Sequence, residues 1–168
     1  GTSAFTTSTN DQAITLGDTS NALTGAVAFT TGGTTGNVTI DNGTTALDLA
    51  ASTISGTLSA TGGASAGIVD SGNVAVAGNV TLTTDAGNGV INMGTLQQSA
   101  GDLILVTNGN GAATVVNNAA IDFGTSNVRG ALSATASAGT ITQNGGALTV
   151  AGTSAFTTST NDQAITLG

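Results

Sequence analysis

The sequence predicts an all-β fold, and two observations favour a parallel β-solenoid within that class. Short segments that alternate apolar and polar residues recur roughly every ten residues, bounded by Gly and Asn. No window carries a sustained helical period of 3.6 residues, and 26 Gly residues would break any helix. The same pattern of short alternating segments bounded by Gly and Asn continues along the whole chain, which is typical of stacked coils.

The predicted strands are rich in Thr and Val, which suit a pleated and half-buried surface. Asn and Gly between them tolerate the left-handed backbone conformation that sharp corners require. The strands are expected at residues 13–17, 27–30, 37–40, 47–50, 57–60, 73–78, 79–84, 90–94, 103–106, 113–116, 121–124, 140–143 and 147–152.

The two ends of the chain are identical in sequence. Residues 1–17 read GTSAFTTSTNDQAITLG, and residues 152–168 read the same. This offset of 151 residues predicts a tandem repeat of 151 residues, of which the chain shows one unit and a short overlap. We therefore expect residues 1–168 to form a single continuous β-solenoid segment.

A weaker repeat lies inside the long one. Residues 46–61 read ALDLAASTISGTLSAT and residues 120–135 read AIDFGTSNVRGALSAT, at an offset of 74. The match continues without a gap, so that residues 46–94 match residues 120–168. The 151-residue unit is therefore interpreted as a diverged pair of half-repeats of slightly unequal length.

Two all-β architectures compete for this pattern. Asn-Gly steps are the strongest short hairpin signal and favour tandem antiparallel sandwiches. Fine repetition, the absence of Pro and a small aliphatic core favour a solenoid, because each coil must donate its backbone N–H groups to the next. With two or three strands in a coil of about 19 to 25 residues, one unit holds about six to eight coils and is ~30–38 Å long.

The charge of the chain excludes several classes of partner. It carries one Arg, no Lys or His, and nine Asp, for a formal net charge of −8. Nucleic-acid binding needs clustered Lys and Arg, so we expect no nucleic-acid partner. Attraction to an anionic membrane fails for the same reason, and no apolar run approaches the ~18 residues of a membrane helix. We therefore expect no membrane insertion.

The repeat texture also resembles a known family. The segments GALTVAGTSAFTT (146–158), NDQAITLG and AGTITQNGGALTVAG resemble the repeats of filamentous-haemagglutinin-like giant exoproteins, which are adhesins of Gram-negative bacteria. The likeness covers essentially the whole chain and lies in alternating strands followed by G-x-L-x-V-x-G. It implies a right-handed parallel β-helix, secretion to the cell surface through an outer-membrane partner, and a role in adhesion or biofilm.

The residues do not favour an enzyme. A nucleophile–base pair usually needs His or Lys, and the sequence has neither. Paired carboxylates for glycoside hydrolysis remain, and Asp48 and Asp122 occupy equivalent places in the half-repeats. In a solenoid they would lie about three or four coils apart, too far to flank one bond. We therefore expect no catalytic residue, no cofactor-binding residue and no cofactor.

Arg129 is the only cation in the chain. Its half-repeat equivalent is Ser55, so the fold does not demand a charge at this position. We expect Arg129 to be a solvated surface residue. An ion pair with a surface carboxylate such as Asp122, and a contact between neighbouring fibres, are the alternatives.

Two further kinds of site have weak signals. The turns at Asp41 and Asp85 resemble oxygen-ligand turns for Ca²⁺, but isolated Asp turns do not supply about six to eight oxygens. Ordinary Asx turns and no metal site are therefore expected. Thr-x-Thr segments at 81–83 and 140–142 have the pattern of an ice-binding face, which would need it on nearly every coil. Thr is also simply a good strand residue.

The four Phe residues are predicted to lie in the core. At the half-repeat offset, Phe123 replaces Leu49 and Phe156 replaces Leu82, so that each Phe places a larger side chain in an aliphatic core. The other two are Phe5 and Phe29.

Two functional hypotheses follow from the sequence. The first is a structural rod or filament-forming segment of a large secreted or cell-surface repeat protein, acting as a fibre or adhesin stalk. Its partner would be itself, end to end and in lateral fibre assembly. The second is a binding module whose solenoid face recognises glycans, a host surface or a neighbouring cell. Both hypotheses place the chain outside the cell.

Overall fold

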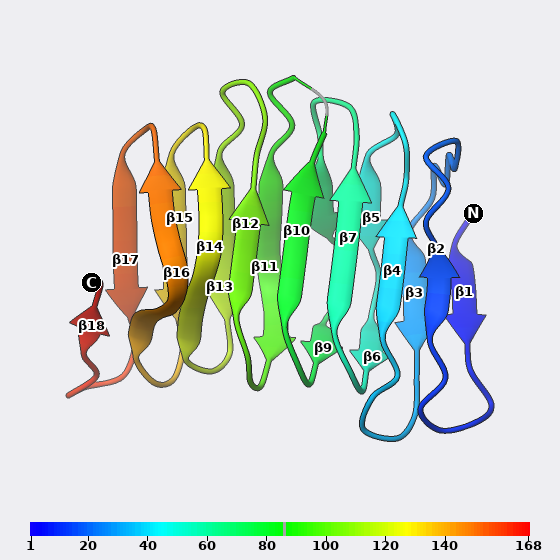
Figure 1. The fold of residues 1–168 in the computed structure, drawn as a ribbon, viewed down its shortest axis with the longest axis horizontal. Coiled ribbons are helices and arrows are strands. Elements are labelled where there is room, and N and C mark those ends of the chain that lie inside the picture. The colour runs from blue at the N-terminus through cyan, green and yellow to red at the C-terminus, as the bar shows by residue number, and fades with distance from the viewer. Residues whose placement is uncertain (86) are drawn as a thin grey trace.

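The computed structural model describes residues 1–85 and 87–168, which wind into a solenoid of parallel strands (Figure 1). In Figure 1 the strands of the near sheet point up, those behind point down, and the chain advances from right to left. This winding is right-handed, as parallel crossovers generally are. The predicted parallel β-solenoid is confirmed, with the hand that the family resemblance implies. The described residues contain no helix that could span a membrane.

The coils stack into two sheets, here named sheet A and sheet B. Sheet A contains β1 Ser3–Thr6, β3 Val27–Thr30, β5 Leu47–Leu49, β6 Ser52–Ile54, β8 Ile68–Asp70, β9 Val74–Val76, β11 Ile91–Gln98, β13 Ala113–Asn117, β15 Leu132–Ala136 and β17 Ser154–Thr158. Sheet B, the near sheet of Figure 1, contains β2 Ile14–Leu16, β4 Val38–Asp41, β7 Leu58–Gly62, β10 Val80–Thr84, β12 Leu103–Val106, β14 Ile121–Val128, β16 Ile141–Val150 and β18 Ile165–Thr166.

All pairings between the described strands are parallel, so the alternative of antiparallel sandwiches is wrong. Ala113 pairs with Leu132 across one of the shorter coils, and Ser3 pairs with Val27 across one of the longer ones. Both spacings lie within the predicted range of coil lengths. Seven steps lead from β1 to β17. At ~4.8 Å per step the 151-residue unit is ~34 Å long, within the predicted range.

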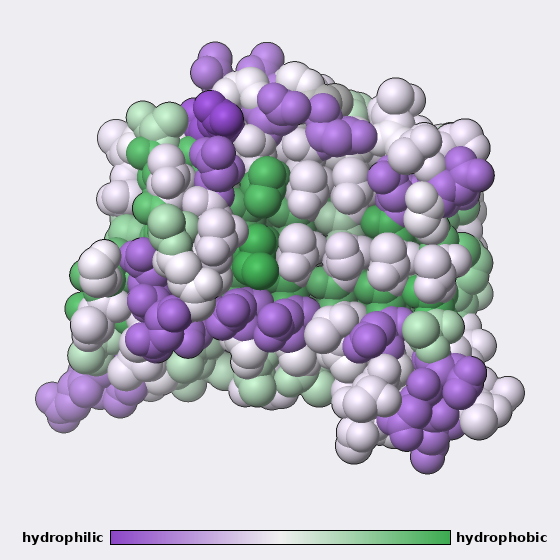
Figure 2. Space-filling model, viewed as in Figure 1, coloured by the Kyte–Doolittle hydropathy of each residue, from purple (hydrophilic) through white to green (hydrophobic). Residues whose placement is uncertain are grey.

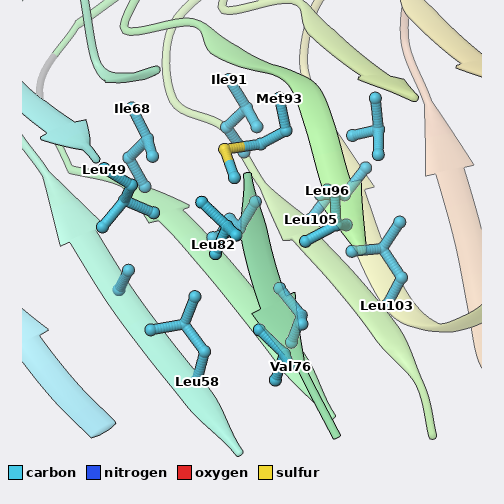
Figure 3. Packing of buried hydrophobic residues seen from close by; sticks show 14 of the residues in the cluster. Leu49, Leu58, Ile68, Val76, Leu82, Ile91, Met93, Leu96, Leu103 and Leu105 are labelled. Atoms are coloured by element: carbon cyan, nitrogen blue, oxygen red, sulfur yellow. The ribbon is translucent and has the colours of Figure 1, made fainter. Parts of the chain in front are cut away.

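The core lies between the two sheets and forms because side chains alternate along every strand. In β9 and β10 the first, third and, in β10, fifth residues are buried, while those between them face outward. Figure 3 shows Leu49 and Ile68 from sheet A near Leu82 and Leu58 from sheet B, with Met93 filling the space above Leu82. Each fully buried Leu or Ile contributes about 1.5–3 kcal/mol relative to an exposed one.

Buried polar side chains close the corners of the coils. Thr31 donates its hydroxyl proton to the carbonyl oxygen of Gly36 at 2.8 Å, and its oxygen accepts the N–H of Ser55 on the next coil at 3.0 Å. Thr107 makes the same pair of bonds, to Gly111 at 2.6 Å and from Arg129 at 2.8 Å. The corner hydroxyls therefore satisfy backbone groups that the sheets leave without partners.

The half-repeats lie on opposite sides of the solenoid. Residues 58–62 form β7 in sheet B, whereas their half-repeat equivalents, residues 132–136, form β15 in sheet A. In the same way residues 80–84 form β10 in sheet B, and residues 154–158 form β17 in sheet A. The half-repeat offset thus corresponds to three and a half coils, and the full unit of seven coils returns to the same sheet.

Most predicted segments form strands, but six strands of the described chain, β1, β6, β8, β15, β17 and β18, lie outside them. Several of their inward side chains are small or polar, as with Ser52 in β6 and Ala134 in β15, which weakens the hydrophobic alternation. The segments 140–143 and 147–152 join into the single strand β16. The Asn-Gly steps at residues 42, 88, 108 and 110 form corners and turns, and Asn88 has a left-handed φ of 63°. The step at residue 144 lies inside β16 instead.

Candidate functional site: a side groove and the surface carboxylates

A shallow groove lies on the outer surface of sheet A. Its floor follows β6, β9 and the second half of β11, where Thr53, Ala75 and Gln97 are neighbours in register. The groove has a volume of about 640 Å³ and is lined by Gly33, Thr34, Thr53, Ile54, Ser55, Ala75, Val76, Ala77, Gln97, Ser99, Asn118 and Ala119.

One rim of the groove is a loop that a carboxylate holds in place. The Asp11 Oδ1 atom accepts the backbone N–H groups of Thr34 at 2.7 Å and Thr35 at 2.8 Å. These bonds, first that from Thr34, lower the pKa of Asp11 below its ordinary value of 3.8. Asp11 on the preceding coil therefore holds this loop in place through two backbone N–H groups of the loop.

The groove offers hydrogen-bonding groups and small apolar groups. Its lining residues supply hydroxyls from Thr and Ser, amides from Gln97 and Asn118, and methyl groups from Ala, and they include no ionisable side chain. Such a surface can hydrogen-bond a neutral polar ligand, but its lining has no group that could act as a base at neutral pH.

Asp48 and Asp122 lie far apart, in different sheets. Asp48 is on β5 in sheet A, and Asp122 is on β14 in sheet B, three and a half coils further along the solenoid. Among the described residues, the buried Oδ1 atom of Asp48 has no hydrogen-bond partner. The structure therefore does not bring the two carboxylates together as a pair that could flank one bond.

Asp122 is held by the neighbouring coil. Its Oδ1 atom accepts the N–H of Asn144 and the hydroxyl of Thr142, both at 2.9 Å. Partial burial opposes ionisation, but the hydrogen bonds from Asn144 and Thr142 together outweigh it and lower the pKa of Asp122. This carboxylate connects β14 to β16.

Arg129 is exposed and directly follows β14. Its backbone N–H is bound to Thr107, as that of its equivalent Ser55 is bound to Thr31. The carboxylate of Asp122 accepts its hydrogen bonds from residues of β16. Arg129 forms no ion pair among the described residues. The predicted solvated position agrees with this exposure.

The turn at Asp41, which resembles a calcium loop, has a carboxylate oxygen directed to the backbone. Asp41 Oδ1 accepts the N–H of Gly43 at 2.8 Å, which is the Asx turn that the sequence predicts. Within the described residues no three acidic side chains gather in a way that could hold a metal ion. In the turn at Asp85, Ala86 lies outside the described residues.

The Thr-x-Thr segment 81–83 does face outward on sheet B. Thr15, Thr39, Ser59 and Thr81 follow one another in register along β2, β4, β7 and β10. The next position is Ile104 on β12, and Figure 2 shows an apolar spot over β12 beside a pale row of polar side chains. The hydroxyl ladder therefore stops after four strands, which does not favour an ice-binding face.

The prediction of core Phe residues holds for the inner two. Phe29 and Phe123 are fully buried, whereas Phe5 and Phe156 are half-buried because each lies in an end coil. Phe5 stacks on Phe29 with ring centroids 5.8 Å apart. Phe123 and Phe156 meet edge to face at 6.0 Å.

Comparison with known families identifies the repeat. The sequence matches the family described as repeats of unknown function (DUF5649) over residues 35–107 and 110–168, which is more than half of the chain. The chain belongs to this family. No curated protein and no solved structure matches it.

The two DUF5649 repeats begin at residues 35 and 110. The first begins just before β4 in sheet B, and the second just before β13 in sheet A. Successive DUF5649 repeats in this chain therefore begin on opposite sides of the solenoid, in agreement with the half-turn between the half-repeats.

Sequence reasoning did not find the groove. Its floor residues are ordinary outward positions of strands, and its shape depends on loops from other coils. The one signal in the sequence is the glycine-rich run TGGTTG at 31–36, which forms the rim around Gly33 and Thr34.

Proposed function

We propose that the chain is a rod-forming segment of a large secreted or cell-surface repeat protein, acting as a fibre or as the stalk of an adhesin. One observation carries the proposal. The identical segments 1–17 and 152–168 form the same two strands in the same two sheets, seven coils apart. A further unit can therefore continue the solenoid after residue 168 with the contacts that residues 1–17 already make.

The chemistry of the surface supports a mechanical role. The carboxylates of Asp11 and Asp122 accept hydrogen bonds from the following coil, so they stabilise the stacking. The proposal includes no enzymatic activity, because the sequence has no His or Lys for a nucleophile–base pair and its equivalent carboxylates Asp48 and Asp122 lie in different sheets. The net charge of −8 argues against nucleic acid as a partner.

The extracellular location is supported by the resemblance of the repeat texture to filamentous-haemagglutinin-like exoproteins. It is also supported by a surface built from Thr, Ser, Asn and Gly with 6% charged residues, far fewer than in ordinary soluble domains. Detection of the repeat by antibody on intact cells, or in the medium, tests this part of the proposal. Signal only after cell lysis would contradict it.

A second candidate function is a binding module, and the side groove favours it. A volume of about 640 Å³ lined by hydroxyls, amides and methyl groups is suited to a neutral glycan on a host or neighbouring cell. Filling the floor with Ala75→Trp would block such a ligand. Ser133→Trp, at an exposed position of β15, is the matched control.

Deleting one 151-residue unit from a longer array separates the two functions. A fibre that becomes shorter by one unit but adheres as before supports the rod. A fibre that loses adhesion with the deleted unit, and likewise with Ala75→Trp but not with Ser133→Trp, supports the binding module and contradicts a purely structural role.

A further inference from the structure

The chain contains five Asn-Gly steps, with Asn at residues 42, 88, 108, 110 and 144. An Asn followed by Gly can lose its side-chain amide without an enzyme, because the backbone nitrogen of Gly, with no Cβ atom beside it, can attack the side-chain carbonyl carbon of Asn. The five steps share this chemistry in the unfolded chain. Differences in their reactivity in the folded chain therefore come from the structure.

Asn108 lies at the corner between β12 and β13, where the two reacting groups already meet. The N–H of Gly109 donates to the side-chain oxygen of Asn108 at 2.8 Å. The carbon that would be attacked lies one bond from this oxygen, so the nitrogen is close to the separation of about 3–3.5 Å that a near-attack arrangement needs. The same hydrogen bond polarises the carbonyl group. Both residues are exposed, so that water and hydroxide reach them.

The side-chain nitrogen of Asn108, which would leave in this reaction, is held weakly. It donates to the carbonyl of Asp85 at 3.2 Å, which is at the upper end of the range for such hydrogen bonds. Because the bond lies at an exposed position, water can replace it at little cost in free energy. The fold therefore does little to retain the leaving group.

Asn42 has the opposite environment. Its side chain is fully buried, and its amide donates to the carbonyl groups of Leu23 at 3.0 Å and Ala46 at 2.8 Å. The N–H of Gly43 is bound to the carboxylate of Asp41 at 2.8 Å. Both the attacking and the leaving groups are occupied, so the fold protects this step.

The steps at Asn110 and Asn144 are each restrained in one group. In the first, the N–H of the attacking residue, Gly111, donates to the carbonyl of Asn108 at 2.9 Å, and Gly111 is buried. In the second, Asn144 lies within β16, and its amide donates to the two carboxylate oxygens of Asp122 at 3.3 and 3.2 Å. Neither step combines an attacking nitrogen in place with a weakly held leaving group.

The side chain of Asn88 is turned toward the following coil. Its Oδ1 atom accepts the N–H of Asn110 at 2.8 Å, and Gly89, which would attack it, is buried. Among the described residues, a hydrogen bond from the Gly nitrogen to the side chain of its own Asn occurs only at Asn108.

We propose that Asn108 is a site of spontaneous deamidation through a cyclic imide. Hydroxide removes the N–H proton of Gly109, the nitrogen forms a bond to the side-chain carbon Cγ of Asn108, and the Cγ–Nδ2 bond breaks. The amide nitrogen leaves as ammonia with a proton taken from water, which regenerates hydroxide. Water then opens the imide at one of its two carbonyl groups and leaves either an aspartate or an isoaspartyl linkage through the side chain.

This reaction alters one corner in every unit of a longer array. Each product adds one negative charge to a chain whose net charge is −8. The isoaspartyl product also lengthens the backbone between Thr107 and Gly111, which a hydrogen bond of 2.6 Å closes. The half-repeat equivalent of Asn108 is Thr34, so the sites lie one unit, ~34 Å, apart on one side of the rod. The inference goes beyond a mechanical role, because the rod accumulates charge with age at fixed places.

Mass spectrometry of peptides from the full chain, aged at mildly alkaline pH in buffer and in urea, tests the proposal. In buffer, residue 108 should deamidate at least about tenfold faster than each of the other four steps, because it alone has the near-attack arrangement. In urea the five steps should react at similar rates. Equal rates in buffer, or a faster reaction at another step, would overturn the proposal. A preference for residue 108 that persists in urea would assign it to local sequence and overturn it too.

The release of ammonia from two variants gives a second measurement. Asn108→Ser should remove the fast phase of ammonia release, whereas Asn110→Ser, at the same exposed corner, should retain it. Circular dichroism shows whether both variants keep their β structure. An unchanged fast phase in Asn108→Ser would contradict the assignment of the site, while the proposed rod would stand.

Discussion

At the scale of single residues, the solenoid depends on buried polar side chains that bond to the backbone at its corners. Asn42 and Asn117 lie equally far from the starts of the two DUF5649 repeats, and both are fully buried. Each bridges coils: Asn117 Oδ1 accepts the N–H of Gln98 at 2.8 Å, and Asn42 Oδ1 accepts the N–H of Leu23 at 2.8 Å. Ser52 and Ser126 form a similar pair, each accepting a backbone N–H of the preceding coil at 3.0 Å.

Replacing Asn117 by Ala should destabilise the chain by about 1–3 kcal/mol, because the buried N–H and carbonyl groups of Gln98 would both lose the bonds that the Asn117 side chain makes to them. The measurement is the midpoint of urea unfolding. Asn92→Ala is the control, since Asn92 is exposed on β11, and it should change stability by less than about 0.5 kcal/mol. Equal effects of the two substitutions would contradict the role given to the corner.

The hydrogen bonds of Asp122 predict a dependence of stability on pH. The pKa of Asp122 is lowered in the folded chain, so its contribution is fully present above the unfolded value of 3.8 and is lost as pH falls through the lower folded value. Asp122→Asn should therefore flatten the acid side of the stability curve. Urea midpoints between pH 6 and pH 2 measure this, and identical slopes for wild type and variant would rule it out.

At the scale of strands and corners, the sequence predicts the inward–outward alternation well but the joining of segments poorly. Strands such as β10 are visible because Val80 and Leu82 alternate with Thr. The Asn-Gly-Gly run at 144–146 predicts a turn, yet the strand β16 passes through it with a bulge. The strand continues through this run because β16 pairs with β14 of the neighbouring coil, and this pairing cannot be read from residues 144–146 alone.

The groove was unpredictable for the same reason. Thr53, Ala75 and Gln97 become neighbours through register across three coils, and nothing in a short window of sequence reports that register. The wide separation of Asp48 and Asp122, in contrast, follows from spacing alone, because the whole half-repeat offset lies between them. Local chemistry could thus be predicted, while the shape of the surface could not.

The tight stacking of corners predicts that Gly67 does not tolerate a side chain. Its φ is +58°, and a Cβ atom there would collide with the carbonyl oxygen of Val90 on the next coil. Gly67→Ala should cost at least about 1 kcal/mol through backbone strain alone. Gly94→Ala on β11 is the matched control, because its Cβ would meet only Asp70 at 3.8 Å. Comparable thermal unfolding of both variants would contradict the close approach at this corner.

At the scale of the whole molecule, the half-turn between DUF5649 repeats explains why the unit is long. One repeat of three and a half coils ends in the opposite sheet from the one in which it began, so two are needed to return to the same orientation. The same sequence pattern must then serve both sheets, and β7 and β15 show that it does. Any feature carried by each repeat would alternate between two opposite sides of a rod.

A chain extended by a second unit, residues 1–168 followed by another copy of 18–168, should be a straight continuation of the same rod. Seven added coils at ~4.8 Å should lengthen it by ~34 Å, with no hinge at the junction, since residues 152–168 would gain on their open face the partners that residues 1–17 already have. Small-angle scattering and electron microscopy of both chains measure the increment. Two compact beads, or a variable angle between the halves, would show that the junction does not transmit the stacking and would remove the basis for a structural rod.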